Sequence, residues 1–324
     1  MTFTVNKADW VNEWSIQYTA IRNNTPDILN KLRSIKRITD YTGGEKYIFR
    51  DYDNNQGTMN DVNLNERNRQ FQWQAFDRGG RQFSRIRVNY PVLVDTEQEV
   101  KNTLSSPKED ILRTIQNKFL KRRNKAISDA VIADAQIIQA DGTVSAVSAS
   151  NDGVITTDLT SGTFDKNTFI NIRNKFVANE VVDASLYDLG GDVIVSQAEM
   201  SEIIKDQSLD LGQTSQFLAD DFKSGATRNM FYGFQVLEVA GNDSTDPDIS
   251  VNTPMLTEAT QKRNCLALAP NALAYWEGEL TIDLLTPHEM RANGYDDSFG
   301  IFFAVDFILG RTKGNRVQVI QTAL

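Results

Sequence analysis

The sequence contains very few of the residues from which most active sites are built: among 324 residues there is one histidine, His288, and one cysteine, Cys265. A single histidine excludes a metal site with several histidine ligands. The sequence also lacks the Gly-x-Ser-x-Gly turn that would expose a nucleophilic serine for His288 to activate. One cysteine excludes an intramolecular disulfide framework and suits a reducing compartment. Because Cys265 lies in the apolar segment "RNCLALAP", we predict a buried side chain there rather than a nucleophile.

The sequence also lacks a long hydrophobic run. Its longest, "FGIFFAVDFILG", is too short to span a bilayer and contains Asp306. The first residues, "MTFTVNKADW", have no basic start followed by an apolar core, so no secretory signal is predicted. We therefore expect a soluble intracellular protein without a membrane partner.

Motifs for cofactors and metals are incomplete. "DYDNNQG" resembles a calcium loop, but Gly57 falls one position late and Val62 stands where a bidentate glutamate is needed. "TGGEK" at 42–46 is too short for a phosphate-binding loop, and the acidic loop at 241–250 is expected to be solvated. We predict no enzyme activity, no cofactor and no metal site.

What the sequence does have is an uneven distribution of charge. Residues 1–130 hold 22 Lys and Arg against 16 Asp and Glu, a net charge of +6, whereas residues 131–324 hold 12 against 27, a net charge of −15. Such a molecule is suited to meeting copies of itself head to tail, because opposite potentials then face each other. The alternative is that the asymmetry only keeps the protein in solution.

A long arginine-rich excursion follows the N-terminal part. Between Arg67 and Pro91 there are six arginines and one acid, Asp77. Apolar and polar residues alternate in "QFQWQAF", "DRGG" is typical of a turn, and residues 86–94 alternate in a return strand; a change of parity just before this strand suggests a bulge. An isolated two-stranded hairpin is at best marginally stable in water, so we expect it to lie on another surface.

The most regular pattern begins at "SSPKEDILRTIQNKF". Ser106 is a predicted N-cap, Pro107 the first helical residue, and Glu109 the partner in a capping box. Apolar residues then recur at helical spacing, which predicts a helix over 107–139, about 50 Å long. Its basic run at 121–125 is predicted to be a solvated or neighbour-facing side of the helix, with Arg123 interrupting the apolar stripe, rather than a phosphate site.

The remainder alternates helices and strands. Residues 140–163 are typical of a surface loop or weak hairpin. A helix is predicted in "FDKNTFINIRNKFVANEV", a buried strand in "DVIVS", and a second capping box, Ser196 to Glu199, opens the next helix. "FYGFQVLEV" and "NCLALAPNALAYW" are predicted strands, and the chain ends in two strands joined at "GRTKGN".

This order of elements resembles the major capsid proteins of tailed bacteriophages, which share the Hong Kong 97-type fold, and among them the podophage-like coat proteins. The segments that carry the resemblance are "RVNYPVLVDTEQEVKNTLSSPKEDILRTIQNKFLKRRNKAISDAVIADA", "DVIVSQAEMSEII", "MFYGFQVLEV" and "RVQVIQTAL". The resemblance spans nearly the whole length, and it rests on the order and spacing of elements rather than on one diagnostic motif.

The resemblance implies an α+β capsid fold with an N-terminal arm, an extended loop, a peripheral domain and an axial domain. The implied boundaries are 1–44 for the arm, 45–95 for the extended loop with its two-stranded hairpin, 96–162 for the peripheral domain with spine helix 107–139 and the following loop, 163–295 for the axial domain, and 296–324 for C-terminal strands that complete the peripheral domain.

The resemblance also implies a structural function. Copies of the chain would form the pentamers and hexamers of an icosahedral virion capsid, assembled in the bacterial host cytoplasm, around double-stranded DNA held by non-specific contact. A scaffolding protein, separate because the arm begins at Met1, and a portal protein at one vertex are implied partners. A decoration protein is left open.

On this basis the excursion lies across a neighbouring copy, with its arginines over an acidic surface and its aromatic side chains seating the strand. A guanidinium can hold a carboxylate through two hydrogen bonds, and each exposed pair contributes only about 0–1 kcal/mol, which a shell repeats in every subunit. The predicted inter-subunit residues are Arg67, Arg69, Phe71, Trp73, Phe76, Arg78, Arg81, Phe83, Arg85 and Arg87.

Two other functions stay open. An encapsulin-like nanocompartment shell of the same fold would enclose an enzyme cargo instead of a genome. A protein that binds single-stranded DNA or packages DNA would use Trp73 and Phe76 to stack on bases, although such binders are usually basic overall. The contents of particles distinguish the first from a capsid, and retention of a monomer on DNA at moderate salt would favour the second.

Overall fold

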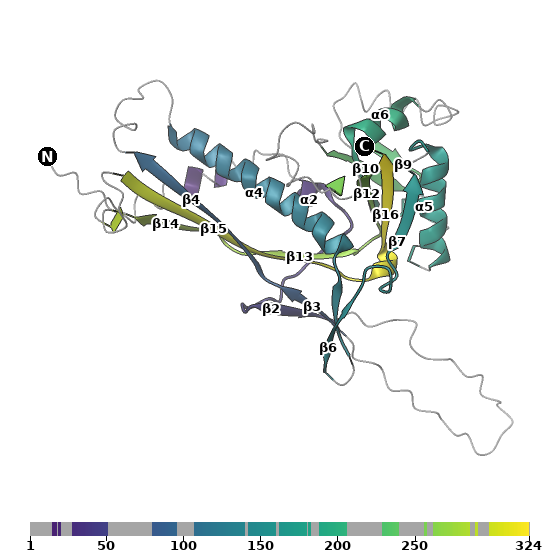
Figure 1. The fold of residues 1–324 in the computed structure, drawn as a ribbon, viewed down its shortest axis with the longest axis horizontal. Helices are drawn as coiled ribbons and strands as arrows, with labels where there is room; N and C mark the ends of the chain where they lie inside the picture. Colours follow the sequence, from purple (N-terminus) through teal and green to yellow (C-terminus); the bar gives the residue numbers. More distant parts are fainter. Residues whose placement is uncertain are drawn as a thin grey trace, which may run out of the picture.

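The computed structural model describes residues 15–17, 19–20, 28–50, 80–95, 107–139, 142–159, 162–179, 181–182, 188–205, 229–239, 256–257, 262–285, 289–290 and 298–323. The helices among them are α2 (Ile28–Lys31), α4 (Pro107–Ile132), α5 (Lys166–Ala178) and α6 (Gln197–Lys205), with a 3-10 turn, η2, at Gly314–Arg316. Figure 1 shows α4 lying along one sheet, while α5 and α6 gather around another.

Helix α4 covers a five-stranded sheet. Its strands are β1 (Ile35–Arg37), β4 (Ile86–Asp95), β13 (Leu273–Glu277), β14 (Thr281–Leu285) and β15 (Ser298–Arg311). β15 pairs antiparallel with β4 on one side and with β14 and β13 in succession on the other, and β1 adds parallel to β13. Leu112 and Ile115 of the helix pack with Ile301 and Phe303 of β15, which confirms the predicted apolar side of the helix.

The helix ends earlier than its sequence pattern predicts. The spacing predicts a helix over 107–139, whereas α4 ends at Ile132, after 26 residues and about 39 Å, and residues 135–138 form a strand. The prediction is wrong at this end because the apolar spacing continues through the strand, whose backbone finds partners in another sheet. At the other end, the Ser106–Glu109 capping box lies outside the residues whose side chains are described.

A seven-stranded sheet forms a second part of the fold, at one end of α4 (Figure 1). Its strands are β7 (Ile155–Leu159), β8 (Gly191–Ser196), β9 (Asn229–Phe231), β10 (Phe234–Val239), β11 (Leu256–Thr257), β12 (Lys262–Leu268) and β16 (Val317–Ala323). The order is β7-β16-β12-β8-β10-β9, with β11 beside β12. The predicted strand "DVIVS" is β8, and all of its residues are buried. The two C-terminal strands are confirmed as β15 and β16.

Two predicted helices pack near this sheet. Phe169, Ile172 and Phe176 of α5 are buried in the main core, as their spacing predicts. At the start of α6, the Ser196 amide donates a hydrogen bond to Glu199 Oε2 at 3.1 Å, so the predicted return bond of the capping box is confirmed. Both helices could be predicted because their signals are local.

The third sheet has four strands and lies at the two ends of the excursion. They are β2 (Lys46–Phe49), β3 (Gly80–Ser84), β5 (Ala135–Ile138) and β6 (Val144–Val147), paired antiparallel in that order. The segment predicted as a surface loop or weak hairpin, 140–163, forms no hairpin of its own in its described part: β6 pairs with β5, which precedes the segment, and its other strand joins the seven-stranded sheet. The predicted strand in "QFQWQAF" lies outside the described residues.

The alternation of apolar and polar residues shifts by one position before Ile86, and at this point the chain passes from one sheet to another. β3 ends at Ser84, the Arg85 amide donates to the Glu45 carbonyl at 2.8 Å, and β4 then joins the five-stranded sheet. The bulge suggested by the sequence is therefore a strand break. Pairing of β2 with β3 brings the two ends of the 50–80 segment together.

The implied domain boundaries stay a prediction, and the sheets divide the chain differently: β13 and β14, from the implied axial segment, and β4, from the implied loop, lie in the sheet under α4. β15 lies under α4, whereas β16 lies in the seven-stranded sheet beside β7 and β12. The closing pair of strands therefore links the two larger sheets, with η2 between them.

Candidate functional site: the arginine-bearing strands

The residues predicted to contact a neighbouring copy fall into two groups. Six of them lie outside the described residues: Arg67, Arg69, Phe71, Trp73, Phe76 and Arg78. The other four lie where the excursion joins the sheets. Arg81 and Phe83 belong to β3, Arg87 belongs to β4, and Arg85 lies between the two strands.

Arg81 is part of a buried ion cluster within the chain. Its Nη1 donates to Asp152 Oδ2 at 2.8 Å and its Nη2 to Asp152 Oδ1 at 2.5 Å, the two-bond geometry that a guanidinium favours. Arg311 Nε donates to the same carboxylate at 2.8 Å. The exposed fractions of the Arg81, Asp152 and Arg311 side chains are 14%, 4% and 2%. We call these three residues the Asp152 cluster.

The same cluster closes the C-terminal end of α4. Arg311 Nη1 donates to the carbonyl oxygens of Val131 and, at 3.2 Å, of Ala133, so it satisfies groups that a helix end leaves without partners. Burial lowers the pKa of the Arg311 guanidinium, and the charge of Asp152 opposes that effect. The cluster therefore joins β3, the turn before β7, the end of β15 and the end of α4.

Two glycines allow this close packing. A Cβ on Gly314 would lie 2.0 Å from the Asp152 carbonyl oxygen, and one on Gly310 would lie 2.2 Å from the ring of Phe83. Neither position has room for a side chain without movement of its neighbours. The base of the excursion is thus packed against the end of β15.

Phe83 is likewise used inside the chain. Its side chain is buried with Ile38, Ala274 and Ile308, and its ring stacks on Phe49 with centroids 5.9 Å apart. Buried aromatic pairs of this kind stabilise beyond the area they bury. In the described part of the chain, Phe83 therefore anchors β3 to β2 and to the five-stranded sheet.

Arg85 and Arg87 are arranged differently. They approach Asp306 of β15 at 3.9 and 3.8 Å, and their side chains are 33% and 50% exposed. Such long, exposed ion pairs contribute little to folding. These two cations therefore keep the solvent access that a contact with another molecule needs, whereas Arg81 does not.

The sequence does not reveal which acid pairs with Arg81, or that Arg311 shares it. Asp152 lies in the small polar segment "SASNDG", and Arg311 follows the buried run of β15, 159 positions later. An arginine directly after a buried strand is a weak signal for a buried partner, since a guanidinium is rarely buried unpaired. Nothing in the sequence identifies which acid that partner is.

The basic run of α4 holds a second buried ion pair. Arg123 Nη1 donates to Glu277 Oε2 at 2.8 Å and to the Tyr275 hydroxyl at 3.2 Å, and the Tyr275 hydroxyl also bonds Glu277. Burial raises the pKa of Tyr275, Arg123 opposes this, and Glu277 adds to it. Arg123 thus lies on the packed side of the helix, where the sequence predicts that it interrupts the apolar stripe, and it fastens α4 to β13, whereas Lys121 of the same run is exposed.

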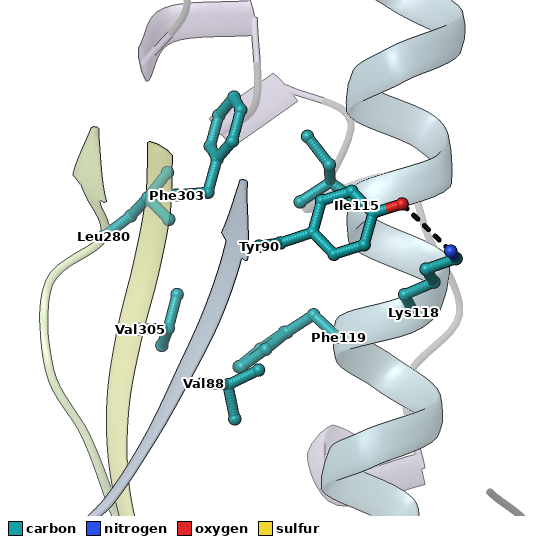
Figure 2. Close-up of a pocket in the computed structure, with 8 residues that line it drawn as sticks. All are labelled: Val88, Tyr90, Ile115, Lys118, Phe119, Leu280, Phe303 and Val305. Carbon is teal, nitrogen blue, oxygen red and sulfur yellow. Dashed lines mark hydrogen bonds between the residues drawn. The ribbon is translucent and has the colours of Figure 1, made fainter. Parts of the chain in front are cut away.

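A small apolar cavity of about 50 Å³ lies between α4 and strands β4 and β15. Figure 2 shows Phe119 of the helix reaching toward Val88 and Ile115 lying beside the Tyr90 ring, while Lys118 Nζ donates to the Tyr90 hydroxyl at 2.9 Å. Apart from the two polar residues, Lys118 and Tyr90, which bond to each other, the lining side chains are apolar.

Within the part of the chain that is described, no helix is long and apolar enough to cross a membrane, and no three His, Cys, Asp or Glu side chains gather as metal ligands. Cys265 is buried as predicted, and burial, with the charge of Glu199 adding to it, raises the pKa of its thiol. His288 and the segment resembling a calcium loop lie outside the described residues.

The chain matches no protein-family model and no curated protein. By structure it is similar to the capsid of Helicobacter pylori bacteriophage KHP30, with 8% identity, a TM-score of 0.62, and coverage of 93% of this chain and 92% of that one. The capsid structure of cyanophage P-SCSP1u is similar at 10% identity and TM-score 0.55, over 92% and 88% of the two chains. A virus-like particle from Pyrococcus furiosus is similar at 11% identity and TM-score 0.55, over 96% and 99%. The chain therefore has the α+β fold found in these shell structures.

Proposed function

We propose that this chain is a major capsid protein of the Hong Kong 97-type, a coat protein that assembles into the icosahedral shell around the double-stranded DNA of a tailed bacteriophage. The observation that carries the proposal is the end-to-end structural match with phage capsid chains: nine-tenths of this chain corresponds to about nine-tenths of theirs. A fold shared over about nine-tenths of both chains leaves little sequence for a separate activity.

The elements map onto the proposed fold as follows. α4 and the five-stranded sheet correspond to the spine helix and the main part of the peripheral domain. The seven-stranded sheet with α5 and α6 corresponds to the axial domain that gathers around five-fold and six-fold positions. Within residues 45–95, β2 and β3 form the base of the extended loop, whereas β4 belongs to the five-stranded sheet.

The base of the loop explains how a long arm can serve assembly. The Asp152 cluster and Phe83 hold β3 against α4 and β15, so the loop leaves the body from a fixed position. A fixed start reduces the conformational entropy that the loop loses when it settles on a neighbour. Its cations then contribute weak contacts of about 0–1 kcal/mol each, which a lattice repeats while errors remain reversible.

The proposed partners follow from this function. Further copies of the chain form the pentamers and hexamers, and a scaffolding protein, a portal protein and the packaged DNA complete the assembly in the host cytoplasm. The protein carries out no reaction in this account. Its function is to build the shell.

The direct test is negative-stain imaging of the purified chain, alone and with its scaffolding protein. We expect closed shells of uniform size. Material that stays monomeric under both conditions, at protein concentrations where related shells form, would contradict the proposal.

The loop arginines are tested by reversing Arg67, Arg69 and Arg78 to glutamate. Arg81 is left in place, because reversing it would put two carboxylates together inside the Asp152 cluster and confuse folding with assembly. We expect folded protein that forms no particles. A control with the same charge change reverses three exposed lysines, Lys31, Lys121 and Lys205, and should still assemble. Equal assembly of the two variants would contradict the role of the loop arginines.

A nanocompartment shell is the second candidate, because a virus-like particle is among the similar structures. The contents of particles purified from the native host distinguish the two: encapsulated DNA supports the capsid, and an enzyme cargo supports the nanocompartment. Retention of monomeric chain on single-stranded DNA, without particles, would instead favour a DNA-binding protein.

A further inference from the structure

A basic hollow lies between the first two strands, at the base of the extended loop and apart from the arginines at 67–87. Its volume is about 660 Å³, and it is lined by residues 36–40, which continue β1, and residues 47–50, which include most of β2. In the described part of the chain, β1 is the last strand of the five-stranded sheet and β2 is the last strand of the four-stranded sheet. The hollow is therefore bordered by two sheet ends.

The walls of the hollow are positively charged. Lys36, Arg37 and Arg50 line it and are exposed, against a single acid, Asp40. Asp40 is already engaged, because its Oδ1 accepts a hydrogen bond from the Tyr47 hydroxyl at 2.9 Å. The hollow thus has an excess of cationic donors.

These cations have no acidic partner among the described residues. Lys36 lies 5.0 Å above the ring of Phe49, which fixes its stem without neutralising its charge. Arg37 donates to a neutral group, the Asn30 side chain, at 3.1 Å. The described ion pairs include none to Lys36, Arg37 or Arg50.

The complementary charge is found in the rest of the chain. Residues 131–324 carry 27 acids against 12 bases, and their exposed acids include Asp158 on β7, Glu202 on α6 and Glu238 on β10. The hollow lies in the net-positive part of the sequence. Opposite potentials of this kind favour association of the basic part of one copy with the acidic part of another.

We propose that the hollow between β1 and β2 is a docking site for acidic side chains from residues 131–324 of a second copy of this chain. The proposal rests on the proposed function, and adds to the loop a second, separate contact between subunits. A second copy fits better than nucleic acid, because every position in the proposed shell supplies an acidic neighbour.

The test cross-links assembled particles made from a mixture of isotopically labelled and unlabelled chains. A carbodiimide joins the Lys36 amine to a carboxylate only when the two are in contact. We expect mixed-label peptide pairs between Lys36 and an acid within residues 131–324, found by mass spectrometry. Particles in which Lys36 forms no mixed-label pair would overturn the inference while leaving the capsid function intact.

A variant pair gives an independent readout. Lys36→Glu with Arg37→Glu should raise the protein concentration needed for assembly about tenfold, which corresponds to two exposed ion pairs per subunit. Lys31→Glu, an exposed change on α2 outside the hollow, should leave this concentration unchanged. Equal thresholds for the two proteins would contradict the docking site.

Two outcomes separate this inference from its alternatives. Protection of Lys36 from acetylation in DNA-filled particles, but not in empty shells, would assign the hollow to nucleic acid and overturn the inference. Wild-type chains that form no particles or oligomers at all would contradict both the docking site and the capsid function.

Discussion

Replacing Asp152 by asparagine should destabilise the chain far more than its position in a turn suggests. The substitution keeps the size of the side chain but removes the negative charge that Arg81 and Arg311 share. Asparagine can still accept one hydrogen bond through its remaining oxygen. Two guanidinium groups would then lie together without the carboxylate that they both contact, and only the weaker influence of Asp134 on Arg311 would remain.

The magnitude follows from burial. All three side chains of the Asp152 cluster are less than one-sixth exposed, so solvent screens their interaction only weakly. Removing one partner of a buried ion pair typically costs about 3–5 kcal/mol. Since one hydrogen bond remains, we expect a loss of about 3 kcal/mol in the free energy of unfolding. A domain with a typical stability of about 5–15 kcal/mol would still fold.

The control is Asp129→Asn, which breaks a different arginine–aspartate pair on α4. Asp129 lies 3.7 Å from Arg122, and the two side chains are 54% and 43% exposed, so this loss should stay below about 1 kcal/mol. Both variants are unfolded in urea as unassembled chains and followed by far-ultraviolet circular dichroism. If the free energy of unfolding falls with urea concentration at the same slope in both variants, the difference between them lies in stability.

The reasoning fails if the two variants differ by less than about 1 kcal/mol, because the Asp152 cluster would then behave as a surface pair. Arg81→Lys gives a second readout, since it keeps the charge but not the two-bond geometry. It should lose less stability than Asp152→Asn.

Three further predictions concern Gly310, Cys265 and Tyr47. Gly310→Ala should lose about 1–3 kcal/mol of stability in urea, because its Cβ would enter a buried phenylalanine ring, whereas Gly162→Ala meets only ordinary contacts and should be neutral. Cys265 should not react with a thiol reagent until the chain is unfolded, since burial raises its pKa and blocks access. Burial, with a hydrogen bond and charge from Asp40, raises the pKa of Tyr47 to about 12. Because this pKa lies above the unfolded value of 10.0, the neutral side chain stabilises the fold below pH 10, and this stabilisation is lost as the pH rises toward 12. Absorbance titration should show this late tyrosinate, and Asp40→Asn should lower its pKa part of the way; a Tyr47 that titrates near 10 would contradict the geometry.

Elements with a local signal could be predicted from the sequence. The burial of Phe169, Ile172 and Phe176 follows from their spacing alone, and the Ser196–Glu199 bond follows from residues three apart. The two C-terminal strands were predictable for the same reason. Each of these depends on interactions within one element.

Elements decided by distant partners could not be predicted in the same way. The end of α4 depends on Arg311, which satisfies its last carbonyls, and on β3, which pairs with the residues that follow it. The use of Arg81 and Phe83 inside the chain depends on Asp152 and Ile308, which no spacing rule connects to them. A sequence reveals that an arginine needs a partner, but tertiary packing selects which one.

The most direct test of the central claim removes the loop and keeps its base. Because the β2–β3 pairing places Phe49 opposite Arg81, residues 54–76 can be replaced by a short Gly-Ser linker without separating the two strands. Sedimentation velocity, with a thermal melt on the same sample, then reports assembly and folding together. We predict single chains with the thermal midpoint of unassembled wild-type protein. Shells formed in wild-type yield by this variant would contradict the claim that the loop joins one copy to the next.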